Sequence, residues 1–290
     1  MSRIRILLLL ASLLTSSCAH GAGVKVVYPA EESDNDRRHI DLVEILRVAL
    51  EKTTPEFGPY ELKPSSLRMS KARYLSALQE RQLINITWSS TSNEMETNFS
   101  PIRIPLRKGL LGYRIALIAK EKQAVIDKVQ TAEDLRRLTI GQGIDWSDAK
   151  LYEAHGIKVV SGKYENLFKM TGLMRFDMFP RGVGEIFTEY ELNAKSVPNL
   201  AIEKNLLIIY PWPYYFFFNK ADAALKQRVE AGLHKMLKDG SFDQIFMKYN
   251  RAAIERANLK GRRVIRLQNA LLPKETPIND PTMWFDPSKY

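Results

Sequence analysis

The chain has 290 residues, of which 45% are hydrophobic, which is enough for one large or two modest domains with ordinary hydrophobic cores. Its single cysteine excludes an intrachain disulfide. The 43 Lys and Arg residues against 33 Asp and Glu residues give a formal net charge of +10, which favours an anionic ligand or membrane surface, but their dispersal along the chain argues against nucleic-acid binding.

The first residues have the order that is typical of a secretory signal. Arg3 and Arg5 precede an apolar run at 6–14, and small and polar residues follow it. The apolar run is far shorter than the ~20 residues that are needed to span a bilayer. We therefore predict that residues 1–22 are a cleaved signal peptide and that the mature protein is periplasmic.

Two alternatives to simple cleavage remain open for this segment. Cys18 stands where the lipidated cysteine of a lipoprotein could stand, but Thr15 occupies a position where such motifs prefer an aliphatic residue. A short N-terminal membrane anchor is the other alternative, and the length of the apolar run disfavours it.

From residue 24 onward, strand and helix patterns alternate. The first part predicts helices near 40–51 and 71–82 and strands at 24–28, 60–66 and 84–90. The next part predicts strands, with helices between them, at 114–120, 138–143, 157–162, 175–179 and 206–210. This alternation implies mainly parallel sheets. No repeat of 20–50 residues is present, so the pattern indicates two similar lobes rather than a solenoid.

Two stretches rich in proline and glycine interrupt this alternation. They cover 101–114 and 210–218, and the second ends in five consecutive aromatic residues. Proline and glycine permit sharp changes of chain direction, so we interpret both stretches as crossings between the lobes, with plain loops as the alternative. The aromatic run at 214–218 predicts a strand that is buried on both faces.

The stretch at 220–250 predicts two amphipathic helices separated by Gly240. With its central DGSF and its terminal lysine and tyrosine, it resembles the last helices of bacterial extracytoplasmic solute-binding proteins of family 3, the polar-amino-acid-binding class. The resemblance implies the periplasmic-binding-protein type II fold. In that fold, two α/β lobes are joined by two hinge crossings and close on a small molecule.

The resemblance also implies a division of the chain. Lobe one would comprise 24–108 plus 214–272, and lobe two 109–213. The tail at 273–290 contains four prolines, which exclude a regular helix. We expect this tail to wrap over a lobe as extended chain anchored by Trp284 and Phe285, with a disordered end as the alternative.

Sequence signatures of catalysis are absent. The chain has no GxSxG, HExxH or Walker motif, and its four histidines are scattered. We therefore expect no catalytic residue, no cofactor and no metal site, and a binding function rather than an enzymatic one.

Second-lobe ligand contacts are expected after two strands. The GQG turn at 141–143 leads into a helix, and the resemblance places Gln142 and Trp146 on the cleft wall. Family members carry a GRxDA segment that leads to an aspartate for the ligand's amino group. Here Arg181 occupies that region instead, so we expect it to bind an anion. Glu185 follows in the first turn of a helix and is an expected ligand contact, with a solvated helix face shared with Glu189 as the alternative.

First-lobe ligand contacts depart from the family pattern as well. Relatives carry an arginine for the ligand carboxylate shortly after the third strand, and the segment 87–99 has none. Thr91 lies in this segment and Arg103 in the following crossing, where Arg107 or Arg114 could also substitute. Both Thr91 and Arg103 are expected ligand contacts. Tyr28 and Trp88 lie near the carboxyl ends of strands, where crevice ligands bind, although aromatic residues there are equally often core.

These features predict an exported monomer that captures a small anionic molecule for transport or sensing. Its partner would be a membrane permease of an ABC transporter or a sensor kinase. One alternative is a ligand-sensing module for a membrane receptor. Another is a lyase of the same fold similar to cyclohexadienyl dehydratases, with Glu185 or Glu189 as the general acid.

Overall fold

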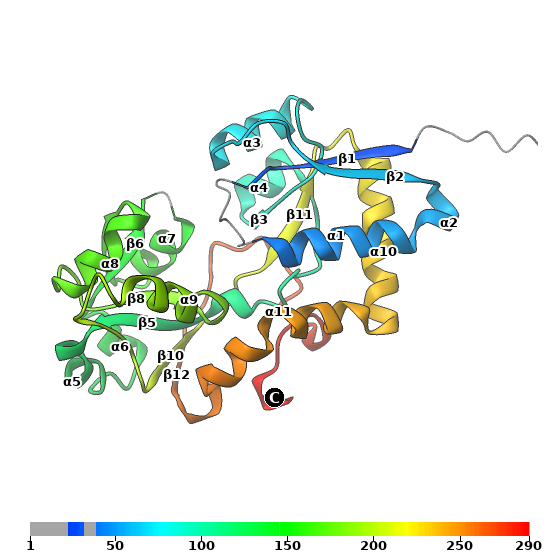
Figure 1. Cartoon of the computed structure of the whole chain (residues 1–290). Coiled ribbons are helices and arrows are strands. Elements are labelled where there is room, and N and C mark those ends of the chain that lie inside the picture. The colour runs from blue at the N-terminus through cyan, green and yellow to red at the C-terminus, as the bar shows by residue number, and fades with distance from the viewer. Residues whose placement is uncertain (1–22, 32–38, 145, 290) are drawn as a thin grey trace, which may run out of the picture.

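The computed structural model describes residues 23–31, 39–144 and 146–289. The predicted signal segment and Cys18 lie outside these residues. Figure 1 shows two α/β lobes side by side, with the long helix α11 (Ser241–Ala257) running beneath both. The predicted fold class, a two-lobed α/β protein with helices flanking the sheets, is confirmed.

Two small sheets form the centre of the first lobe. β1 (Val24–Tyr28) pairs in parallel with β2 (Tyr60–Pro64). The other sheet has the antiparallel order β3 (Thr87–Ser90), β11 (Tyr214–Phe218) and β4 (Ser100–Ile102). The helices of this lobe are α1 (Ile40–Lys52), α2 (Thr54–Phe57), α3 (Lys71–Gln79), α4 (Asn93–Asn98) and α10 (Ala223–Asp239). Four of the five aromatic residues in β11 have no exposed surface, which confirms the buried strand.

The second lobe is centred on β5 (Tyr113–Ala119). β5 runs antiparallel to β8 (Phe179–Gly182), β9 (Leu200–Ile202) and β10 (Leu206–Ile209). β6 (Thr139–Gly143) and β7 (Lys158–Gly162) form a parallel pair that joins β8 through a bridge between Ile140 and Met178. The helices are α5 (Gln123–Ile126), α6 (Ala132–Leu135), α7 (Ser147–Ala154), α8 (Tyr164–Gly172) and α9 (Val183–Asn193).

The sheets are mixed rather than mainly parallel. β5 and β11 each enter their lobe from a crossing and not from a helical connection, and both pair antiparallel with their neighbours. A further strand, β12 (Arg263–Arg266), pairs in parallel with β10. These residues fall within the 214–272 span that was predicted for lobe one, yet their hydrogen bonds attach them to the second-lobe sheet. The remaining lobe boundaries stay a prediction.

The predicted helix pair at 220–250 is present as α10 and α11. Gly240 between them has a φ of +79°, in the left-handed region that glycine adopts without strain. Gly232 lets α10 approach α1 closely, because a Cβ at this position would lie 2.2 Å from the carbonyl oxygen of Ala49. α11 continues past the predicted end at residue 250 to Ala257.

α11 contributes to the cores of both lobes. Phe242 and Ile245 pack in the first-lobe core, whereas Phe246 and Ile254 pack in the second-lobe core. The chain then returns through β12 into a tail that is held at its aromatic residues. Phe285 is 4% exposed and lies in the second-lobe core. α11 and the tail therefore connect the lobes in addition to the two crossings.

Candidate functional site

Charged side chains from both lobes gather where the lobes meet, and we call this group the interlobe cluster. Its members are three arginines and four carboxylates: Arg107, Arg114, Arg181, Asp41, Asp148, Glu185 and Glu189. Arg107 comes from the first crossing and Asp41 from the start of α1. The others come from second-lobe strands and helices. The two sides are linked by the charge of Arg107, which acts on Glu185 in the second lobe.

Arg181, on β8, forms a two-pronged ion pair with Glu189 on α9. Its Nε and Nη2 donate to the two carboxylate oxygens of Glu189, each at 2.6 Å. The guanidinium carbon lies 4.7 Å from the ring centroid of Trp146, and the Tyr164 hydroxyl donates to Glu189 at 2.8 Å. Arg181 is 5% exposed and Glu189 is 9% exposed. Glu189 therefore does not lie on a solvated helix face, as its spacing from Glu185 had suggested, but neutralises a buried arginine.

Arg114, on β5, has an equivalent partner on the other face of the sheet. Its Nη2 lies 2.5 Å from Oδ2 of Asp148, which also accepts a hydrogen bond from the Tyr210 hydroxyl at 2.9 Å. Arg114 is 4% exposed. The third arginine, Arg107, donates from Nε and Nη2 to both oxygens of Asp41 at 2.6 and 2.7 Å. Each guanidinium of the cluster thus has a carboxylate of its own.

Glu185 is the shared and most exposed carboxylate among the second-lobe members. Its Oε2 lies 3.1 Å from Arg181 Nη2 and 3.8 Å from Arg114 Nη1, and it accepts from the Gly182 amide at 3.1 Å. Its side chain is 31% exposed. Burial alone would raise the pKa of Glu185, but the guanidiniums of Arg181, Arg114 and Arg107 lower it. Glu185 is therefore held as a carboxylate anion between these arginines.

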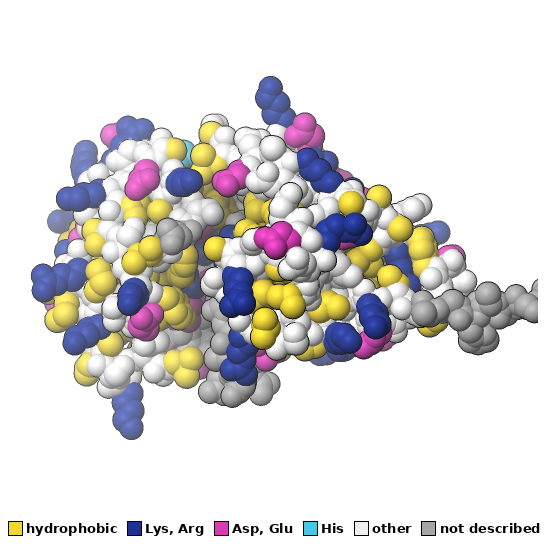
Figure 2. Space-filling model, turned by 90° about the horizontal axis from the view of Figure 1, so that it is seen from above, with side chains coloured by type: hydrophobic (Ala, Val, Ile, Leu, Met, Phe, Trp, Pro, Cys, Tyr) yellow, Lys and Arg dark blue, Asp and Glu magenta, His cyan; other side chains and the backbone are white. Residues whose placement is uncertain are grey.

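Lys71 at the start of α3 brings a fourth cation to this region. Figure 1 shows the first turn of α3 on the side of lobe one that faces lobe two. Lys71 is an exposed residue, but partial desolvation lowers its pKa and outweighs the opposing effect of the Asp148 charge in the other lobe. Within the described part of the chain, Lys71 has no carboxylate oxygen within 4 Å. On the face of the molecule that Figure 2 shows, Lys and Arg side chains are not gathered at one place. They are spread over both lobes rather than gathered in a stripe.

The structure brings together three of the second-lobe residues that the sequence suggested. Trp146, Arg181 and Glu185 lie in contact or close to one another. Gln142 lies apart from solvent, at 0% exposure, and neither its amide nitrogen nor its amide oxygen has a hydrogen-bond partner among the described residues. Gln142 thus belongs to the interior of the lobe in this conformation, because β6 is buried on both faces. Ligand contact by these residues stays a prediction.

The first-lobe candidates form two separate groups. Tyr28 and Trp88 pack together with ring centroids 5.8 Å apart, and Trp88 is only 5% exposed. Thr91 and Arg103 share Glu96, which accepts from the Thr91 hydroxyl at 2.7 Å and from Arg103 Nε at 3.0 Å. Trp88 is thus mainly a core residue. Roles in ligand binding for all four residues stay predictions.

Several members of the cluster were missed by the sequence analysis. Asp41 and Asp148 were not singled out, because each meets its arginine only through the tertiary fold. A local signal did exist for Glu189, since Arg181, Glu185 and Glu189 recur at intervals of four residues from a strand end into a helix. Lys71 carried no local signal at all.

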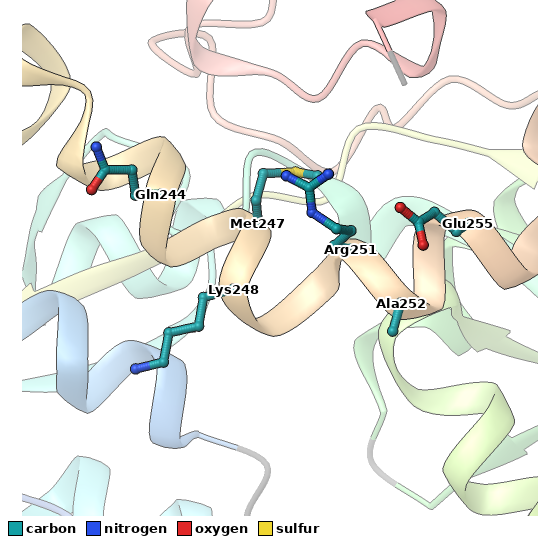
Figure 3. Close-up of a pocket in the computed structure, with 6 residues that line it drawn as sticks. All are labelled: Gln244, Met247, Lys248, Arg251, Ala252 and Glu255. Carbon is teal, nitrogen blue, oxygen red and sulfur yellow. The ribbon is translucent and has the colours of Figure 1, made fainter.

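A shallow groove along α11 is a weaker candidate. Figure 3 shows its six lining residues, and all of them project from this one helix: Gln244, Met247, Lys248, Arg251, Ala252 and Glu255. Lys248 points toward α1, where it pairs with Glu44 at 2.7 Å. In the described ranges, no three His, Cys, Asp or Glu side chains are grouped so that they could hold a metal ion. The interlobe cluster is therefore the site with the most converging polar groups.

Asp177, two residues before β8, is held by groups of its own lobe. One of its oxygens accepts from the Thr139 amide at 2.7 Å, and the other lies 2.7 Å from Lys122 Nζ. Burial would raise the pKa of Asp177, but the hydrogen bonds from Lys122 and Thr139 lower it. A lowered folded-state pKa stabilises the fold above the unfolded pKa of about 3.9, and this stabilisation is lost as the pH falls through the folded value.

We therefore expect Asp177→Asn to lower the free energy of unfolding by about 1–3 kcal/mol at pH 7, the range for a hydrogen bond to a charged group. The difference from the unsubstituted chain should shrink as the pH falls below about 4, where Asp177 becomes protonated in the unfolded chain, and should reach its minimum below the lower folded-state pKa. Urea unfolding of both proteins across this pH range measures the difference in the free energy of unfolding. Glu153→Gln, at an exposed position on α7, is the control and should show little difference at any pH. If Asp177→Asn lowered the free energy of unfolding by the same amount at every pH, the proposed link between the Asp177 pKa and stability would be contradicted.

Comparisons with known proteins identify the fold but not a family by sequence. No protein-family model matches the chain, and no curated protein matches it. An ancestral arginine-binding protein bound to arginine is 18% identical with a TM-score of 0.53, over 78% of this chain and 97% of that one. An amino acid ABC transporter substrate-binding protein from Streptococcus pneumoniae, bound to L-arginine, is 16% identical with a TM-score of 0.51, over 80% and 95% of the two chains.

A third solved structure is the ancestral amino-acid-binding precursor of cyclohexadienyl dehydratase. It is 17% identical with a TM-score of 0.51, over 78% of this chain and 95% of that one. These identities are too low to carry a ligand or an activity from one protein to another. They confirm, at the level of the fold, the resemblance drawn from residues 220–250. The chain has the two-lobed α/β fold of the substrate-binding proteins of amino-acid ABC transporters.

Proposed function

We propose that this chain is an exported solute-binding protein that holds a small molecule between its lobes at the interlobe cluster. The observation that carries the proposal is the convergence of charged groups from both lobes, with Arg107 and Asp41 on one side and Arg114, Arg181 and Glu185 on the other. Ligands of two-lobed α/β proteins bind where groups from both lobes reach them. The fold, shared with transport proteins that bind amino acids, supports the same role.

The ligand that we propose is a small anion that takes the place of the Glu185 carboxylate. The three arginines are already neutralised, so an added anion gains little unless it exchanges with a carboxylate that is in the site. Glu185 is suited to this exchange because it is partly exposed and is held mainly by charge. Lys71 would then face the bound anion from the other lobe.

Removing the charge of Glu185 tests this proposal. Glu185→Gln should raise the affinity for the anionic ligand by about tenfold, because the competing negative charge is removed while the size of the side chain is kept. A thermal-shift screen of the mature chain against small carboxylates, phosphates and amines identifies the ligand, and calorimetry of the variant measures the change. Glu191→Gln, at an exposed position of the same helix, is the matched control. If the screen instead found an amine whose binding is lost in Glu185→Gln, the ligand would be a cation and the proposal of an anionic ligand would be wrong.

The physical state of Glu185 favours binding over the lyase alternative. A general acid that works near neutral pH needs a raised pKa, so that it carries a proton to donate. The surrounding arginines instead lower the pKa of Glu185. Glu189 is occupied by Arg181 and Tyr164. These contacts support binding rather than proton donation as the role of the two glutamates.

We further propose that the protein works outside the cytoplasm, either delivering its ligand to a membrane permease or reporting it to a sensor kinase. The basic and apolar pattern of residues 1–22 supports export, and this segment lies outside the described residues. Among the described helices, none combines the length and the apolar character of a membrane span. Mass spectrometry of the protein from its native cell should find a mature N-terminus between about residues 18 and 24. An intact Met1 would contradict export.

A further inference from the structure

A second cavity lies beneath the C-terminal tail, and we call it the tail cavity. Its volume is about 590 Å³. The first crossing contributes Gly109 and Tyr113 to its wall, the second crossing contributes Tyr210 and Pro211, and the tail closes it with Trp284. Figure 1 shows the tail running past β10 and β12 toward α11. The cavity is thus built from the connections between the lobes rather than from the lobe faces that form the interlobe cluster.

The charged side chains in the lining of the tail cavity are cations, although the charges of both Arg266 and Asp286 act on Tyr113 in its wall. Arg266 and Lys274 line it, and no Asp or Glu is among its lining residues. Both cations are exposed, and within the described part of the chain neither has an ion-pair partner within 4 Å. In contrast to the arginines of the interlobe cluster, these two cations are available to an added anion.

Most of the rest of the wall is aromatic, aliphatic or already hydrogen-bonded, and the exception is the buried hydroxyl of Thr276, which has no hydrogen-bond partner among the described residues. The Tyr113 hydroxyl donates to the Phe285 carbonyl oxygen at 2.9 Å, and the Trp284 ring nitrogen donates to the Pro277 carbonyl oxygen at 2.8 Å. Asn269 donates from its amide nitrogen to the Pro211 carbonyl oxygen at 3.0 Å. What these residues still present is ring and aliphatic surface. A planar apolar group fits such a wall, with its charge directed to the cations.

We propose that the tail cavity is a second ligand site, and that it takes a small aromatic carboxylate. Because both crossings contribute to its wall, a ligand bound there touches the segments about which the lobes would turn. Such a ligand alters the affinity of the interlobe site if it binds the open and closed lobe arrangements unequally, and the coupling is then reciprocal. Occupation of the tail cavity itself does not depend on whether the interlobe cluster binds a solute.

The probe is naphthalene-2-carboxylate, titrated into the full mature chain by calorimetry. The double variant Arg266→Gln with Lys274→Gln should weaken its binding by at least about tenfold, since two charge-assisted contacts are lost. Ala270→Trp, which fills the cavity from its lining, should abolish binding. Naphthalene-2-methanol has no charge and should bind the double variant and the unsubstituted chain alike. Lys260→Gln, at an exposed lysine outside the cavity lining, is the matched control for lost charge.

The outcomes separate this site from the interlobe cluster. Glu185→Gln should leave the affinity for naphthalene-2-carboxylate unchanged if the compound binds under the tail. A changed affinity in Glu185→Gln, with none in the double variant, would place the compound at the interlobe cluster and overturn the proposal. Absence of any binding at millimolar concentration would overturn it as well. In either case the proposed solute-binding function would still be tested separately, by the thermal-shift screen.

Discussion

Replacing Phe285 with alanine should lower the free energy of unfolding by about 3–5 kcal/mol, the range for removing a buried phenylalanine ring. The ring is 4% exposed, and its centroid lies 5.3 Å from that of Tyr113 and 5.8 Å from that of Phe246. Its backbone amide also donates to the Lys108 carbonyl oxygen at 2.7 Å. Chemical denaturation followed by circular dichroism measures the loss.

The control lies in the same tail. Ile278 is 53% exposed, so Ile278→Ala should change the free energy of unfolding by no more than about 0.5 kcal/mol. If Phe285→Ala had an equally small effect, the tail would not be docked in solution, and the tail cavity would lose its outer wall. The two substitutions therefore also test whether the docked tail forms the outer wall of the tail cavity.

The docked tail bears on how far the lobes can move. Met283 packs against the first-lobe core two residues before Phe285 enters the second-lobe core. α11 spans the same boundary, pairing through Lys248 with Glu44 of α1 and through Arg256 with Glu191 of α9. Hinge closure on a ligand stays a prediction. Any such closure must carry α11 with one lobe and shift its contacts with the other, which restrains the amplitude relative to two free crossings.

Local patterns explain which parts of the fold were predictable. The α10 and α11 pair and the buried β11 follow from periodicity and from a run of aromatic residues, and these signals are contained within a few turns of chain. β12 carries only Val264 and Ile265 between arginines, so its pairing with β10, more than 50 residues earlier, leaves no local trace. The antiparallel pairing of β5 could not be predicted either, because its partner strands are also distant in the sequence.

The site was predictable where strand ends bring residues together. Trp146 follows β6, and Arg181 and Glu185 lie at the end of β8 and the start of α9, so their proximity follows from adjacent strands in one sheet. The partners of the arginines were not predictable, because ion pairing depends on side-chain direction after folding. Gln142 shows the same limit, since the GQG turn indicated a loop at the cleft whereas the residue is fully buried in β6.

Arg181→Ala should lower the free energy of unfolding by about 3–5 kcal/mol, because it leaves the buried carboxylate of Glu189 without its counter-ion. From the sequence, Arg181 was expected to bind an anionic ligand rather than to stabilise the fold. Replacing both partners, as Arg181→Met with Glu189→Leu, should recover most of the loss, since apolar side chains of similar volume can substitute for a buried ion pair. Chemical denaturation of the unsubstituted chain, of Arg181→Ala and of the double variant measures the loss and its recovery.

The control is Arg137→Ala, whose side chain is 80% exposed and whose contact with Asp134 is 3.7 Å long, so it should cost no more than about 1 kcal/mol. An Arg181→Ala variant as stable as the unsubstituted chain would mean that the pair with Glu189 does not hold Arg181 in solution. Arg181 would then be available to an anionic ligand directly, and Glu185 would not have to be displaced. A destabilised variant that is rescued by the second substitution would instead assign Arg181 to the framework of the lobe, which leaves Glu185 and Lys71 as the groups that decide the charge of the ligand.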